Sequence, residues 1–180
     1  MVNSRVMTTW DSRRIMKELA DPARRQRIGT SFWRAADPQS KALATAQLAK
    51  ALRFREESIR KLPLERKGDL LVARFQQPEM ERALEMAIMQ YHTSEASEMM
   101  GAFLDRWKVP HENGAIETDE YETPTTDQVR EAVTELQSRF EPRDIALYLA
   151  SAGLLMGDKW REATWPVVDE MVKERVKSEG

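Results

Sequence analysis

The stretch Ile145–Met156 reads IALYLASAGLLM, and apolar residues fall on nearly every side of it when it is wound as a helix. A helix without a polar face has to be covered on several sides, so we expect this segment at the centre of the fold. Its length of about 12 residues falls short of the roughly 20 that a membrane-spanning helix needs. The segment therefore predicts a buried core helix and no membrane partner.

An acidic or polar residue followed directly by proline marks the start of several further helices. Proline at the first helical position costs no hydrogen bond, and the residue before it can cap the free amides of the first turn. These pairs are Asp21-Pro22, Asp37-Pro38, Gln77-Pro78 and Glu141-Pro142. One more helix starts at a capping box made by Thr125 and Gln128. Near the end, Trp165-Pro166 predicts a kink or a restart of the last helix.

Between these starts the apolar residues recur with the 3.6-residue period of a helix. The stripes are Leu48, Leu52, Ile59 and Leu62 in one long helix from about Pro38; Met80, Leu84, Ile88 and Tyr91; Ala96, Met100, Phe103, Leu104 and Trp107; and Val129, Val133, Leu136 and Phe140. No run alternates with the period of a strand, and we assign Leu70–Val72 to a helix. The predicted fold class is all-α: an irregular bundle or short superhelical array of about eight or nine amphipathic helices.

The segment from Val109 to Pro124 differs from the rest of the chain. It contains Pro110, the pair Asn113-Gly114 and five acidic residues, which is typical of a surface loop. We therefore divide the chain into a basic-to-neutral N-terminal helical layer (1–108), an acidic surface loop (109–124) and a C-terminal helical layer (125–180), together forming one compact domain.

Charge is distributed unevenly along the chain. Residues 1–76 hold 17 Lys and Arg against 8 Asp and Glu, a net charge of +9, whereas residues 77–180 hold 11 against 22, a net charge of −11. Opposite potentials of this kind steer docking within a chain or between chains. The predicted interaction residues are a basic face of Arg53, Arg55, Arg60 and Lys61, and an acidic counterpart of Glu117, Asp119 and Glu120.

The residues that usually carry catalysis or bind cofactors are sparse. The chain has no Cys, which excludes disulfides, thiolate ligands and a thiol nucleophile. His111-Glu112 begins like the zinc-protease motif H-E-x-x-H, but Ala115 stands at the position of the second histidine. The glycines are too scattered for a phosphate-binding loop. The carboxylates of Glu131 and Glu135 share one helix face, which we expect to be solvated. We predict no catalytic residue, no metal site and no cofactor.

The N-terminal half contains a resemblance to a DNA-binding family. Leu19–Ile28 reads LADPARRQRI and is similar to the opening of winged-helix regulators of the arsenic-repressor type. Gln47–Leu52 followed by Glu56–Leu62 resembles a helix-turn-helix. The resemblance implies DNA binding through this half, where clustered Arg and Lys would release counterions from phosphates. Arg53 stands where the turn glycine is usual, and no β-wing follows.

Three functions follow as hypotheses from these patterns. The favoured one is a non-catalytic, cytoplasmic protein-interaction module with oppositely charged halves, which binds a protein partner or itself. The first alternative is a nucleic-acid-binding protein that uses the Arg-rich half. The second is an enzyme whose site is assembled from residues distant in sequence, since a fold alone does not specify a function.

Overall fold

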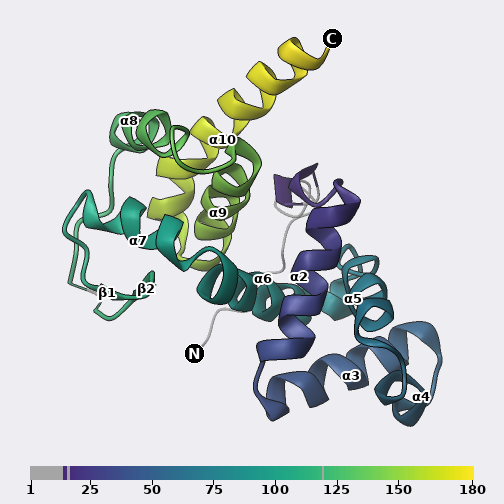
Figure 1. Cartoon of the computed structure of the whole chain (residues 1–180). Coiled ribbons are helices and arrows are strands. Elements are labelled where there is room, and N and C mark those ends of the chain that lie inside the picture. Colours follow the sequence, from purple (N-terminus) through teal and green to yellow (C-terminus); the bar gives the residue numbers. More distant parts are fainter. Residues whose placement is uncertain (1–13, 16, 119) are drawn as a thin grey trace. The chain divides into compact units, whose positions relative to one another are not determined.

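The computed structural model describes residues 14–15, 17–118 and 120–180. Within these ranges the chain forms nine α-helices, one short 3-10 helix (η1) and one two-stranded sheet (Figure 1). The predicted all-α fold class is confirmed. The chain divides into two compact units, the first ending at Glu95 and the second running from Ala96 to Gly180. Among the described helices, none is long and apolar enough to cross a membrane.

The first unit is built around α2, which packs against α5 and α6. Its elements are α2 (Pro22–Ala35), α3 (Pro38–Leu52), α4 (Glu56–Arg60), α5 (Leu64–Val72), η1 (Pro78–Met80) and α6 (Glu81–Glu95). The helix assignment of Leu70–Val72 is confirmed by α5. The contact between α2 and α5 is unusually close, because a Cβ placed on Gly29 would lie 2.5 Å from the Cα of Gly68. These two glycines therefore serve helix packing.

Four of the five expected helix starts are present where the sequence places them, at α2, α3, α8 (Thr126–Leu136) and α9 (Pro142–Leu155), whereas Gln77-Pro78 opens the 3-10 helix η1 and α6 begins only at Glu81. Asp37 caps α3 by accepting hydrogen bonds from the amides of Gln39 (2.8 Å) and Ser40 (2.9 Å). The Ser40 hydroxyl donates a further bond to the same carboxylate at 2.6 Å. These bonds, with the Ser40 hydroxyl first, lower the pKa of Asp37 below its ordinary value of 3.8. Asp21 caps α2, and Thr125 with Gln128 forms the predicted capping box.

The single long helix predicted from Pro38 is wrong, because the chain breaks at Arg53. This residue adopts the left-handed conformation, with φ 54° and ψ 38°. The Phe54 amide then donates to the Ala49 carbonyl (2.9 Å) and the Arg53 amide to the Lys50 carbonyl (3.2 Å). This is the Schellman pattern that closes helix C-termini. The apolar stripe continues into α4 through buried Ile59, so periodicity alone did not reveal the break.

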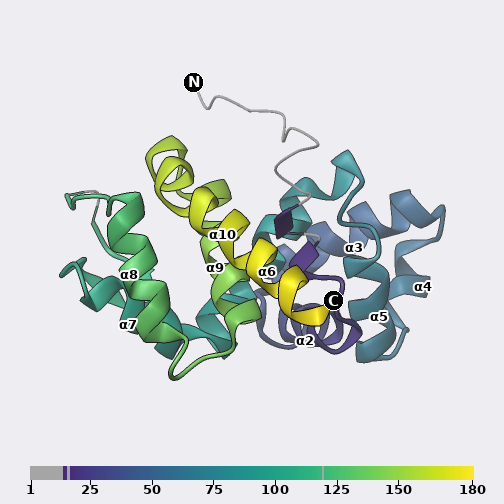
Figure 2. The ribbon, with the colours of Figure 1, turned by 90° about the horizontal axis from the view of Figure 1, so that it is seen from above.

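The second unit is built around α9, the predicted core helix. Its elements are α7 (Ser97–Asp105), β1 (His111–Glu112), β2 (Ala115–Ile116), α8 (Thr126–Leu136), α9 (Pro142–Leu155) and α10 (Asp158–Glu179). Every residue of α9 from Ile145 to Gly153 is buried. Helix α10 packs against both α9 and α8 (Figure 2). It continues through Pro166 without the restart that the sequence suggested.

The segment predicted as an acidic loop contains a hairpin. Strands β1 and β2 are antiparallel, pairing His111 with Ile116 and Glu112 with Ala115. The two turn residues, Asn113 (φ 51°) and Gly114 (φ 85°), both have positive φ. Two such residues form the turn that matches the twist of a two-residue hairpin, and Asn-Gly is its preferred sequence. This segment lies inside the second unit. That it separates an N-terminal helical layer from a C-terminal one remains a prediction.

Candidate functional site

The predicted basic residues lie around the turn between α3 and α4, and all four are exposed. Arg60 donates a hydrogen bond to Glu56 (2.6 Å), and Lys61 lies 3.4 Å from Glu57. Half of this basic face is therefore neutralised within α4 itself. Arg53 and Arg55 form no ion pair within the described part of the chain.

The predicted acidic residues follow the hairpin of the second unit. Glu117 and Glu120 are exposed, and Asp119 lies outside the described residues. The Glu117 amide donates to the Pro110 carbonyl at 3.2 Å, which closes the hairpin at its open end. Because the basic set belongs to the first unit and the acidic set to the second, their pairing remains a prediction.

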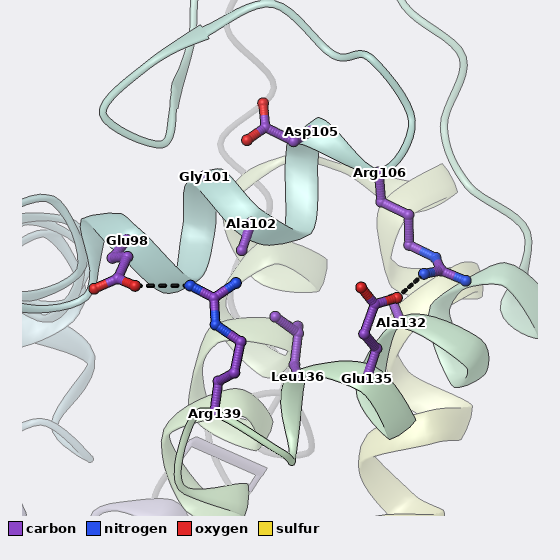
Figure 3. A pocket seen from close by; sticks show the side chains of 9 residues that line it. All are labelled: Glu98, Gly101, Ala102, Asp105, Arg106, Ala132, Glu135, Leu136 and Arg139. Carbon is purple, nitrogen blue, oxygen red and sulfur yellow. Dashed lines mark hydrogen bonds and ion pairs between the residues drawn. The ribbon is translucent and has the colours of Figure 1, made fainter.

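An open groove lies between α7 and α8, within the second unit. Its volume is about 580 Å³ and it opens to solvent. Figure 3 shows its lining: Glu98, Gly101, Ala102, Asp105 and Arg106 from α7 and its C-cap, and Ala132, Glu135, Leu136 and Arg139 from α8 and the turn after it. Glu98 faces Arg139 at one end and Arg106 faces Glu135 at the other, so the two helices run in opposite directions.

Each end of the groove is closed by an ion pair between the two helices. Arg139 donates to Glu98 at 2.8 Å. At the other end Arg106 bonds to Glu135 and reaches Glu131 at 3.5 Å. The side chains of Glu131 and Glu135 are 70% and 68% exposed, so the solvated face expected for this acid pair is confirmed. Exposed ion pairs of this kind are individually weak and can exchange partners.

Between these ion pairs the floor of the groove is small and apolar. Gly101, Ala132 and Leu136 are buried, and Ala102 is partly exposed. The side chains of Ala102 and Ala132 reach only a short way into the groove, so the side chains of a third segment can enter between the two helices. The charged residues of the lining surround this apolar floor. This arrangement favours a ligand that has an apolar ridge along its middle and charged groups on either side of that ridge.

The hairpin is attached beside this groove through His111. The Nδ1 atom of His111 accepts a hydrogen bond from the Gly114 amide (3.2 Å), so a neutral ring carries its proton on Nε2, 3.0 Å from the Asp105 carboxylate. A Cβ on Gly101 would lie 3.2 Å from the ring. The absence of side chains at Gly101 and Gly114 thus lets β1 lie directly on α7. The sequence placed His111 in a loop and missed this role, although Asn113-Gly114 is a hairpin signal.

Three large aromatic residues of the second unit are buried and do not line the groove. Trp160 is 1% exposed and donates its indole N–H to the Tyr121 hydroxyl at 3.2 Å. Trp165 is 7% exposed and donates to the Ala150 carbonyl at 3.2 Å. Tyr148 is also buried, and this burial raises its pKa far above the ordinary value of 10.0. These side chains belong to the core of the second unit.

No three His, Asp or Glu side chains in the described ranges gather closely enough to hold a metal ion. Comparisons of the chain with protein-family models, with curated proteins and with solved structures found no match. The α7–α8 groove, with its apolar floor and ion-paired ends, is therefore assigned as the candidate site on its geometry alone.

Proposed function

We propose that this protein is a non-catalytic interaction module whose α7–α8 groove binds a basic amphipathic segment of a protein partner. The observation that carries the proposal is the open groove of about 580 Å³, which has an apolar floor between two ion-paired ends. Amphipathic segments bind such grooves by placing regularly spaced apolar side chains on the floor.

The shape of the floor indicates what the partner contributes. Ala102 and Ala132 present only a methyl group each, so the centre of the groove has room for larger residues. The Leu136 side chain adds an apolar contact to the floor of the groove (Figure 3). Interface energy usually comes from a few large side chains in well-packed pockets. The partner should therefore present Leu, Met or aromatic residues on one face.

The charge of the site indicates the other face of the partner. Three acids and two bases line the groove, and Asp105 on its rim has a side chain that is 76% exposed. The whole second unit, Ala96–Gly180, has 10 Lys and Arg against 18 Asp and Glu, a net charge of −8. Such a potential steers basic partners and repels acidic ones. Lys and Arg should flank the apolar residues of the bound segment.

Site-specific photocrosslinking in the native host tests this proposal. We would replace Ala102 with p-benzoylphenylalanine, and Thr134, which is exposed on α8 and does not line the groove, as the matched control. We expect one discrete protein to crosslink from position 102 and not from position 134. The purified partner should then bind the full chain, and Ala102→Trp should weaken binding by roughly tenfold or more while Thr134→Trp does not.

Two results would overturn the proposal. The first is equal crosslinking from both positions, or unchanged affinity of a correctly folded Ala102→Trp variant. The second is a crosslinked species that consists only of two copies of this chain, because the occupant would then be the protein itself. Circular dichroism of each variant separates loss of binding from loss of fold.

A further inference from the structure

The turn between α3 and α4 presents an aromatic ring to solvent between two arginines. Phe54 is 53% exposed, and it is the one aromatic residue among the exposed large hydrophobic side chains of the described chain. Arg53 and Arg55 on either side of it are exposed as well. The turn belongs to the first unit, whereas the α7–α8 groove belongs to the second.

The backbone of this turn is strained at Arg53. Its φ of 54° lies in the left-handed region, where glycine is favoured at helix C-termini. Arginine there costs stability that glycine would not. Residues held in such conformations concentrate at sites of binding and catalysis. Arginine at this position supplies a guanidinium group that the favoured glycine would lack.

The two arginines are available to an anionic ligand. Neither has an ion-pair partner within the described ranges. The nearest acids, Glu56 and Glu57, are engaged by Arg60 and Lys61 on α4. Lys50, exposed near the end of α3, adds a further positive charge beside the turn. A ligand with both phosphates and flat rings would complement this arrangement.

We propose that the Arg53–Arg55 turn binds single-stranded nucleic acid, with a base stacked on Phe54 and phosphates contacted by the flanking arginines. Alternating aromatic and cationic side chains are the chemistry by which single strands are held without sequence preference. A duplex buries the faces of its bases and offers Phe54 nothing to stack on. Helix α4, which corresponds to the second helix of the helix-turn-helix resemblance, has only five residues and begins with two glutamates, so the turn is poorly suited to the major groove.

Fluorescence anisotropy with the full chain and labelled 12-nucleotide oligo-dT and oligo-U, a length of roughly one single-strand site, tests the proposal. We expect Phe54→Ala to weaken binding by about fivefold to a hundredfold, since a stacked base is worth roughly 1–3 kcal/mol. Met89→Ala, which removes an equally exposed apolar side chain of the first unit, is the matched control and should leave affinity unchanged. Replacing Arg53 and Arg55 with Ala should reduce the salt-dependence slope by about 1.4.

Arg53→Gly separates a binding role from a structural one. This variant relieves the backbone strain, so it should raise the unfolding midpoint and still weaken binding. Arg34→Ala, which removes one exposed arginine of the same unit elsewhere, should leave binding unchanged. No binding of either oligonucleotide, unchanged affinity of Phe54→Ala, or equal binding of duplex DNA or poly-glutamate would each overturn the proposal.

Discussion

The hydroxyl of Thr126 donates a hydrogen bond to the main-chain carbonyl of Glu162, with 3.2 Å between the two oxygens. That carbonyl lies four residues before Pro166, which has no amide hydrogen and leaves it without its helical donor. Thr126 is the first residue of α8, and Glu162 lies within α10. The Thr126 side chain on α8 thus supplies the hydrogen bond that the Glu162 carbonyl of α10 lacks, and α10 continues past Pro166.

Thr126→Val should lower the free energy of unfolding by about 0.5–1 kcal/mol, because it removes the donor and leaves the Glu162 carbonyl unbonded. Urea unfolding followed by circular dichroism measures the change. Thr134→Val on the same helix is the control, since its hydroxyl bonds only to a carbonyl of its own helix. In a Pro166→Ala background the alanine amide supplies the missing donor, so Thr126→Val should then be nearly neutral. An equal loss in both backgrounds would contradict this account.

Arg53→Gly should stabilise the protein by about 1 kcal/mol, because glycine adopts the left-handed conformation at a helix C-terminus without steric cost. The measurement is the urea midpoint. Arg34→Gly is the control: Arg34 is exposed within α2, where glycine lowers rather than raises stability. If both variants had the same effect, the strain at Arg53 would not be its cause.

Gly29→Ala should destabilise the first unit by about 2 kcal/mol or more, because the added methyl would meet the backbone of α5. Gly68→Ala tests the same crossing from the other side. A Cβ there would lie 3.0 Å from the nearest backbone atom, a milder overlap than the 2.5 Å at Gly29. We therefore expect the smaller loss at Gly68, measured by thermal or urea unfolding. Small losses at both positions would show that the helices move apart easily, and the reverse order would contradict the prediction.

Glu170 should make the stability of the second unit depend on pH below the neutral range. Arg130 donates two hydrogen bonds to it, at 2.9 and 2.8 Å, and these lower the pKa of Glu170 from its ordinary value of 4.5. The folded protein then takes up this proton less readily than the unfolded chain. The stabilisation is present above pH 4.5 and is lost as pH falls through the lowered native pKa.

Glu170→Gln should therefore lower the unfolding midpoint at neutral pH and flatten its decline in acid. Glu162→Gln, at an exposed carboxylate of the same helix without an ion-pair partner in the described ranges, is the control and should keep the wild-type pH profile. Urea titrations at a series of pH values give both curves. Parallel curves for wild type and Glu170→Gln would rule out this ion pair as a source of the pH dependence.

The sequence by itself determined the all-α class and the central buried helix. Asp37 is satisfied by Gln39 and Ser40, and Thr125 by Gln128, so each cap closes within three residues and can be recognised from neighbours alone. The apolar run beginning at Ile145 has no polar face and must be buried wherever it lies. Local hydrogen bonding and apolar periodicity were therefore enough to establish the all-α class.

The tertiary structure decided the candidate site. Arg106 and Glu135 are 29 residues apart in the sequence, and Arg139 and Glu98 are 41 apart. The distribution of charge along the chain does not indicate which of its many acids and bases will pair. The break at Arg53 was hidden because its apolar stripe continues into the next helix. Which helix faces contact each other depends on how all the side chains of the fold pack together. A pattern of neighbouring residues in the sequence does not contain that information.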